Sequence, residues 1–198
     1  FIFLSNFLFA ENLNIQASSI SIDKKKQLTI FKNNVSAKDS KNNILKTDLA
    51  EYKKDTQFLR SRGKTTIQTS EGFLIQGEDI IFDNKNKFIE SNSPAIITDL
   101  EKNNIFLEKF RYATDKKFFK STGNIKVIDS RENSYNFSQI YIDEKKREII
   151  GTDIKAFLNQ RSFKIHEDNK PRIFANTVKI NDNSSEFTKS VFTLCNYR

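Results

Sequence analysis

A repeat of thirty residues constrains the fold of this chain more than any other feature of its sequence. The first copy, which begins at Ile15, carries apolar residues (Φ) in the pattern Φ-x-Φ-x-x-Φ-x-Φ. Four more copies keep register without a gap, and a sixth follows after an eight-residue insertion. The copies read Ile15, Ala17, Ile20, Ile22; Leu45, Thr47, Ala50, Tyr52; Ile75, Gly77, Ile80, Phe82; Ile105, Leu107, Phe110, Tyr112; Tyr135, Phe137, Ile140, Ile142; and Ile173, Ala175, Val178, Ile180.

The spacing inside each copy predicts a bent strand. Alternation with a period of two places Ile15 and Ala17 on one face of a strand, and Ile20 and Ile22 on one face of its continuation. The three-residue step between Ala17 and Ile20 changes the parity of the alternation. We therefore expect a β-bulge or bend at this step, which returns the second pair to the inward face.

Two further strands are expected in each repeat. A charged turn such as Asp23-Lys24-Lys25-Lys26 precedes a short strand, which carries Leu28, Phe58, Phe88 or Phe118. A second turn, at Asn33-Asn34 in the first copy, precedes a third strand. Such a unit cannot bury its own apolar face, so its copies must stack. The sequence thus predicts an all-β fold, an elongated open β-jellyroll of stacked three-strand repeats, whose register degrades from about Gly151.

Composition excludes some classes of protein and partner. Hydrophobic residues make up 37% and charged residues 29%, too apolar for a disordered chain and too polar for a membrane bundle. The net charge of +8 agrees with a partner that carries phosphate or carboxylate groups, and equally with a composition rich in Lys, Asn, Ile and Phe that an AT-rich genome produces. Basic residues are spread over nearly every turn and form no single stripe, so we expect no nucleic-acid partner.

The sequence contains no pattern typical of catalysis. His166 is the single histidine and lies in a charged run, and no cysteine and histidine residues have the spacing of a zinc site. The neighbouring acids Glu78 and Asp79 point to opposite faces of a strand, so their carboxylates do not converge. We predict that the protein is not an enzyme and has no catalytic residues, no metal ligands and no cofactor.

The first ten residues, FIFLSNFLFA, are apolar and too short to span a bilayer. They are typical of the apolar part of a signal peptide that ends at Ala10. This predicts an exported protein whose single domain covers residues 11–198. Cys195 is the only cysteine, which in an exported protein suggests a partner outside this sequence.

Three segments resemble a known repeat. The strand from Ala17 to Asp23, the segment Asp48–Tyr52 and the turn Gly123–Val127 are similar to the OstA-type repeat of the lipopolysaccharide-transport proteins LptA, LptC and the N-terminal domain of LptD. The resemblance implies an open β-jellyroll that carries the acyl chains of lipid A in its interior. It also implies docking to an LptA-like jellyroll by edge-strand addition.

The C-terminal segments 168–174 and 189–195 are similar to the end of the periplasmic domain of LptD, where a Phe-Thr-x-Cys element precedes the outer-membrane barrel. This resemblance implies a barrel after residue 198 and a location at the periplasmic face of the outer membrane. It also implies a disulfide between Cys195 and the barrel, and an LptE-like lipoprotein bound through the barrel. A second cysteine, common near the mature N-terminus of LptD, is missing here.

The predicted function is therefore the transfer of lipopolysaccharide from a periplasmic bridge to an outer-membrane barrel. One alternative is a free-standing LptA-like bridge protein, and another is a non-catalytic β-solenoid adhesin or structural repeat protein. The inward residues predicted to contact lipid are Ile75, Phe82, Ile105, Phe110, Tyr112, Phe137 and Ile142.

Overall fold

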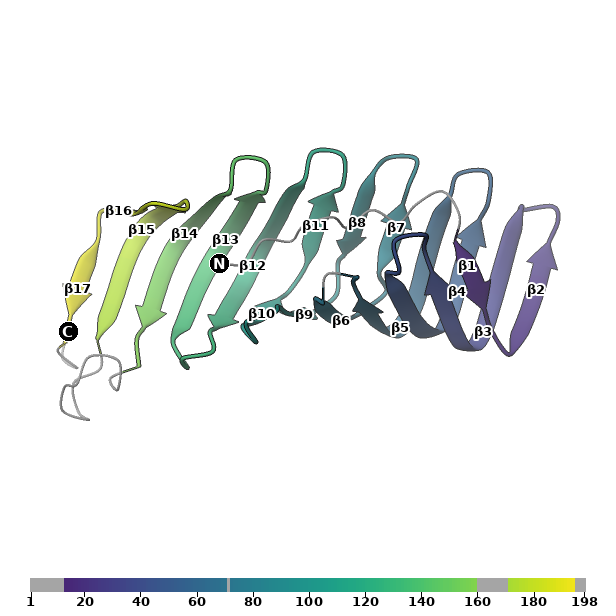
Figure 1. Cartoon of the computed structure of the whole chain (residues 1–198), viewed down its shortest axis with the longest axis horizontal. Coiled ribbons are helices and arrows are strands. Elements are labelled where there is room, and N and C mark those ends of the chain that lie inside the picture. Colours follow the sequence, from purple (N-terminus) through teal and green to yellow (C-terminus); the bar gives the residue numbers. More distant parts are fainter. Residues whose placement is uncertain (1–12, 71, 160–170, 195–198) are drawn as a thin grey trace.

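Strands account for nearly all of the regular structure. The computed structural model describes residues 13–70, 72–159 and 171–194, which form one antiparallel sheet of seventeen strands (Figure 1). The strands are β1 (Asn14–Gln16), β2 (Ser19–Asp23), β3 (Leu28–Lys38), β4 (Ile44–Lys53), β5 (Phe58–Gln68), β6 (Leu74–Glu78), β7 (Ile81–Asp83), β8 (Phe88–Ser91), β9 (Ala95–Thr98), β10 (Asn104–Leu107), β11 (Phe110–Ala113), β12 (Phe118–Ile128), β13 (Ser134–Asp143), β14 (Glu148–Phe157), β15 (Arg172–Ile180), β16 (Ser185–Thr188) and β17 (Val191–Thr193).

The sheet is a meander in which neighbours in sequence are neighbours in space. The long strands β3, β4 and β5 pair in order, as do β12, β13, β14 and β15. Ten short strands form five sets of two, and the two members of each set are the halves of one bent strand. Both halves hydrogen-bond to the same neighbouring long strand, or to the two halves of a neighbouring bent strand. Thus β1 and β2 both pair with β3, β10 and β11 with β12, and β16 and β17 with β15.

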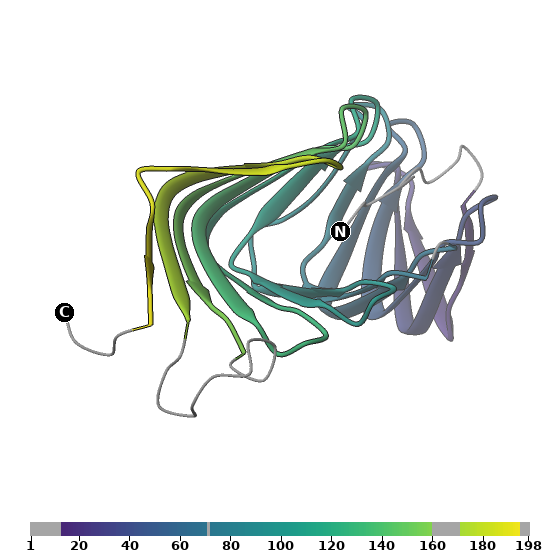
Figure 2. The same ribbon diagram turned by 60° about the vertical axis from the view of Figure 1, so that its left-hand side comes forward.

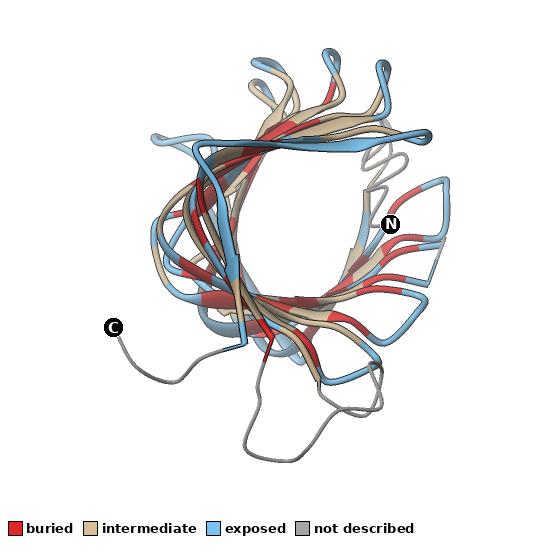
Figure 3. Cartoon of the chain, turned by 90° about the vertical axis from the view of Figure 1, so that its left-hand side faces the viewer, coloured by how far each residue is buried: buried red, intermediate tan, exposed pale blue. Residues whose placement is uncertain are grey.

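Each long strand and each pair of short halves bends near its middle, and in the strands that carry the apolar pattern the bend falls at the three-residue step of the repeat. The break between β1 and β2 lies at residues 17–18, and the pairing of β4 with β5 shifts register between Thr47 and Leu49. The predicted bulge is therefore confirmed. The bends divide the sheet into arm A, with β1, β6, β9, β10 and β17, and arm B, with β2, β7, β8, β11 and β16. Both arms curve around a common interior (Figures 2 and 3).

The prediction of an all-β, elongated open jellyroll is confirmed, but the three-strand unit was wrong. The expected turn at Asn33-Asn34 is a bulge inside the eleven-residue strand β3, where both residues have positive φ (60° and 53°). Gly123 has the same role in β12, with φ 107°. Positive φ bends a strand without ending it. Each repeat is therefore a hairpin of two long strands. Arms A and B, which face each other, are parts of one sheet.

One strand does break where a second turn was expected. Ser93 and Pro94 separate β8 from β9, and proline has no N–H to donate to the ladder. Even here β8 and β9 continue the same bent strand, because β8 pairs with β7 and β9 pairs with β6.

The inward face of the sheet forms a core that is continuous over the first two thirds of the chain. Cross-strand neighbours such as Ala37, Leu45 and Ile67 have almost no exposed surface. A second, smaller cluster lies in β14 and β15 and comprises Ile154, Ala156, Ala175 and Val178. The larger cluster comprises Phe31, Val35, Ala37, Leu45, Ala50, Leu59, Ile67, Phe73, Ile75, Ile80, Phe82, Ile89, Ala95, Ile97, Ile105, Leu107, Phe110, Tyr112, Phe119, Ile125, Ile140 and Ile142.

A ladder of buried side-chain amides connects successive turns at the free edge of arm A, which is the row of turns where its strands end. Asp99 Oδ1 accepts hydrogen bonds from the backbone N–H groups of Glu101 (2.9 Å) and Asn103 (2.8 Å). Asp99 Oδ2 accepts one from Asn103 Nδ2 (2.8 Å). Asn103 Oδ1 then accepts the backbone N–H of Ser130 in the next turn (2.9 Å).

The same contact recurs in other turns of this edge. Asn43 Oδ1 accepts the N–H of Ser70 (2.9 Å), and Asn133 Oδ1 accepts the N–H of Asn159 (2.7 Å). In the turn that begins at Thr69, the position equivalent to Asn103 is Phe73, which carries no amide. The ladder therefore holds the hairpins in register wherever an asparagine is present.

We expect Asn103→Ala to lower the free energy of unfolding by about 2 kcal/mol, because it leaves the buried Asp99 Oδ2 without the hydrogen bond from Asn103 Nδ2 and the Ser130 N–H without its acceptor. Urea denaturation followed by circular dichroism measures this. Asn136→Ala is the matched control, since Asn136 is outward-facing and its side chain makes a single long contact, 3.4 Å to the carbonyl of Lys155. Equal stability of the two variants would contradict a stabilising role for the ladder.

Candidate binding cavity

The inward face opens into a cavity of about 570 Å³ in the C-terminal half of the sheet. Most of its wall is apolar, and polar side chains gather at the edge turns of arm A. The cavity is lined by Glu101, Asn103, Ile105, Leu107, Phe119, Val127, Asp129, Ser130, Arg131, Asn133, Tyr135, Phe137, Ile140, Ile142, Ile149, Leu158, Ile173, Ile180, Ser185 and Phe187.

The cavity lies where the core thins towards the last strands. Ile149, Ile173 and Ile180 face inward but are only half buried. Phe187 pairs directly with the buried Val178, and is nevertheless 40% exposed. Strand β16 is exposed along its whole length, and exposed residues are pale blue in Figure 3. Inward apolar side chains in this region therefore lack the opposing atoms that cover them in the first two thirds of the chain.

Gly151 lies against Phe137, one of the residues that line the cavity. It lies on the inward face, between Ile140 and Val178 in the ladder. A Cβ at this position would lie 2.7 Å from Cδ1 of Phe137, so the absence of a side chain makes room for that ring. Phe137 packs against both core clusters, and it marks the boundary between the filled and the open part of the interior.

The polar edge of the cavity is built around Asp129. Its Oδ2 accepts hydrogen bonds from Asn133 Nδ2 (2.7 Å) and from the hydroxyl of Tyr135 (3.1 Å). Burial, followed by the nearby Asp129 carboxylate, raises the pKa of Tyr135 to about 12. Among the described residues of the lining, Arg131 alone is basic. With a single described basic side chain at its polar edge, the cavity suits an apolar ligand better than a cluster of phosphates.

The predicted lipid-contacting residues divide into two groups. Ile105, Phe137 and Ile142 line the cavity. The other four, which are Ile75, Phe82, Phe110 and Tyr112, face the same interior and are buried in the core, but they do not line the cavity. All seven face inward, which agrees with the alternation in the sequence. Contact with lipid stays a prediction for each of them.

Several cavity residues were not among the predicted contacts. Tyr135 and Ile173 occupy the first position of the fifth and sixth repeats, so the repeat pattern already contained a signal for them. Ile149, Leu158 and Phe187 fall outside that pattern, and only the folded sheet brings them to the cavity. Residues 1–10, His166 and Cys195 lie outside the described residues.

Within residues 13–70, 72–159 and 171–194, no three His, Cys, Asp or Glu side chains lie close enough to hold a metal ion. In the same residues no helix is long and apolar enough to cross a membrane.

Comparisons with known proteins add a structural likeness. No family model matches the sequence, and no curated protein matches it. Among solved structures, the chain is similar to LptH from Pseudomonas aeruginosa, described as the LptA homologous periplasmic component of the lipopolysaccharide transport device. The sequences are 14% identical, the match covers 67% of this chain and 76% of that one, and the TM-score is 0.29. The fold described above rests on the strand pairings of this chain and not on that likeness.

The raised pKa of Tyr135 predicts a pH-dependent stability. Because the folded state favours the protonated hydroxyl, its contribution is complete below the ordinary pKa of 10 and is lost as the pH rises through about 12. Between these values the wild type should lose more stability than Tyr135→Phe. Thermal unfolding across this pH range tests the difference. Tyr141→Phe is the control, because the Tyr141 hydroxyl bonds to Gln139 on the outer face. Equal losses of stability in the wild type and in Tyr135→Phe would contradict the assignment of this pH dependence to Tyr135.

Proposed function

We propose that this protein is a periplasmic module of lipopolysaccharide transport, and that its cavity holds acyl chains of lipid A. The observation that carries the proposal is an apolar cavity of about 570 Å³ in the trough, the interior that arms A and B enclose. Inward side chains on the last strands of this trough are exposed. The resemblance of segments such as Ala17–Asp23 to the OstA-type repeat supports lipopolysaccharide as the particular lipid.

The energetics favour acyl chains as the guest. Transfer of a methylene group from water to an apolar wall contributes about 0.8 kcal/mol, and Ile105, Phe137 and Ile173 supply such a wall. Phosphate groups find one basic side chain, Arg131, beside the acids Glu101 and Asp129. The acyl chains therefore enter the cavity while the charged head group stays outside its polar edge.

The two end strands suit the addition of further jellyrolls. Ile20 on β2 pairs with the buried Phe31, so it faces inward, yet it is 54% exposed. Phe192 on β17 pairs with the cavity residue Ile173 and is 58% exposed. A strand added at either end would cover these side chains and extend the trough. We assign one end to an LptA-like partner.

Within this function, the leading candidate is the periplasmic domain of an LptD-like protein at the periplasmic face of the outer membrane. The similarity of segment 189–195 to the end of that domain supports it, and with it a disulfide from Cys195 and an LptE-like lipoprotein bound through a barrel. A free-standing LptA-like bridge is the second candidate. It is favoured by the exposure of inward apolar side chains at both ends of the sheet.

Site-specific photocrosslinking to lipopolysaccharide tests the proposal. A probe at Phe137 or Ile173 should crosslink, because both line the cavity. Probes at Phe82 and Phe110 should crosslink weakly, because both are buried in the filled core. Lys109, which is exposed at the bend next to β11, is the outward control and should not crosslink.

Each outcome has a definite meaning when circular dichroism shows every probe variant to be folded. Crosslinks at Phe82 and Phe110 as strong as those at Phe137 would show that lipid opens the entire trough and would disprove the restricted cavity. Absence of crosslinks at all inward probes would disprove lipid transport and would favour an adhesive or structural role.

A further inference from the structure

The outer faces of the two arms differ in charge. On arm A, the strand pairings place two rows of side chains outward, opposite in direction to the buried row of Ala37, Leu45 and Ile67. One row consists of Gln16, Ser36, Lys46, Thr66, Gln76, Ile96, Phe106, Lys126, Asn136, Lys155, Phe174 and Val191. The other consists of Asn14, Lys38, Ile44, Gln68, Leu74, Thr98, Asn104, Ile128, Ser134, Phe157, Arg172 and Thr193.

These two described rows contain five basic residues and no acidic one. The basic residues come from both ends of the arm, with Lys38 and Lys46 on β3 and β4, and Lys126, Lys155 and Arg172 on β12, β14 and β15. Acidic residues return at the bend, for example at Asp48, Glu108 and Asp153, and in the turns at the free edge. The flat part of arm A is thus a strip with acidic borders that carries positive charge towards both ends and, in these two rows, no charge on β5, β6, β9 and β10 in between.

The outer face of arm B is electrically balanced instead. Two of its rows contain seven acids and five bases: Ser21, Ile30, Glu51, Arg60, Ile81, Glu90, Arg111, Lys120, Tyr141, Ile150, Lys179 and Glu186 in one row, and Asp23, Leu28, Lys53, Phe58, Asp83, Phe88, Ala113, Phe118, Asp143 and Glu148 in the other. The outward row next to the bend adds two bases, Lys32 and Arg62.

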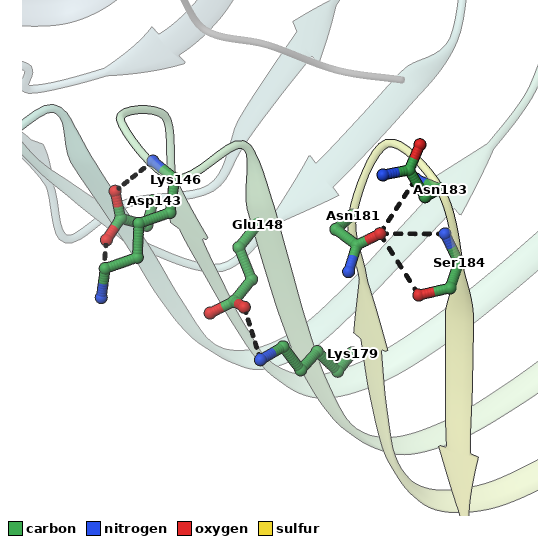
Figure 4. Close-up of polar contacts among 7 residues, drawn as sticks. All are labelled: Asp143, Lys146, Glu148, Lys179, Asn181, Asn183 and Ser184. Atoms are coloured by element: carbon green, nitrogen blue, oxygen red, sulfur yellow. Dashed lines mark hydrogen bonds and ion pairs between the residues drawn. The ribbon is translucent and has the colours of Figure 1, made fainter.

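Ion pairs neutralise much of the charge on arm B. Arg111 lies 3.1 Å from Glu90, and Lys179 lies 2.6 Å from Glu148 (Figure 4). On arm A, none of the ion pairs between described residues involves Lys46, Lys126 or Lys155, which are all exposed. Lys46, Lys126 and Lys155 are therefore exposed to solvent and accessible to an external partner.

Apolar side chains lie among these cations. Phe106 is 36% exposed, Phe157 37% and Val191 59%. Phe157 packs edge-on against Phe174 with ring centroids 6.3 Å apart, and the guanidinium of Arg172 lies 5.9 Å from the Phe157 ring. Aromatic rings beside basic side chains are the combination found where proteins rest on the surface of a lipid bilayer.

We infer that the outer face of arm A docks on the surface of a membrane that contains anionic lipid. The cations complement the lipid phosphates, and the exposed phenylalanines reach the boundary between head groups and acyl chains. A soluble polyanion would satisfy Lys46, Lys126 and Lys155 but would leave Phe106 and Phe157 in water. This inference does not rest on the proposed cavity function, because it uses the opposite face of the sheet.

Vesicle flotation tests the docking surface directly. The full chain should float with phosphatidylcholine vesicles that contain phosphatidylglycerol, should not float with phosphatidylcholine alone, and should be released by added salt. The triple variant Lys46→Gln, Lys126→Gln, Lys155→Gln should bind on the order of 100-fold more weakly, at about fivefold per basic residue near an anionic surface.

The matched control is Lys32→Gln, Lys53→Gln, Lys120→Gln, which removes the same charge from exposed positions on arm B and should bind nearly as the wild type does. Equal weakening in both triple variants would show that net charge alone matters and would overturn the inference. Failure of the wild-type chain to float with the anionic vesicles would also overturn it.

A second pair of substitutions separates a membrane from a soluble polyanion. Phe106→Ser with Phe157→Ser should weaken vesicle binding about tenfold and leave binding to heparin unchanged. Unchanged vesicle binding in this variant would assign the strip to a soluble polyanion and overturn the inference. Lipopolysaccharide crosslinking at Phe137 should be the same in all these variants, so failure of the docking surface and failure of the cavity are distinguishable.

Discussion

The three-residue step in each repeat is the constraint on which the rest of the molecule depends. A strand with unbroken alternation would present one flat face and leave its apolar residues on a single open surface. The step at residues 17–18 and 47–49 and the bulges at Asn33-Asn34 and Gly123 bend neighbouring strands at matching positions along their length. The bend folds one sheet into two arms, and only then does an interior exist.

The interior and the edges follow from how each repeat fills this shape. Large residues such as Phe82 and Phe110 close the trough over the first two thirds of the chain, whereas Gly151 and Phe137 mark where it opens. The asparagine ladder holds the free edge of arm A in register, so the cavity wall is a stacked structure rather than a set of separate hairpins. The same bend gives the molecule two outer faces of different charge.

The sequence was sufficient for the bent strands and the inward face, because both depend on local alternation. It was misleading at Asn33-Asn34, because residues that tolerate positive φ serve equally in turns and in bulges. The position of the cavity could not be predicted, since Phe82 and Ile142 occupy equivalent repeat positions and are both buried, yet only Ile142 lines the cavity. The loss of register near Gly151 marked a real change, yet β14 and β15 still pair along their whole length.

A crystal structure of the protein with lipid A tests the central claim most directly, that the open part of the interior is an acyl-chain site. Our account predicts electron density for acyl chains along Ile105, Phe137 and Ile173, with the side chains from Phe31 to Phe82 packed as they are without lipid. Density on an outer face alone, or an interior that stays empty at saturating lipid A, would contradict it.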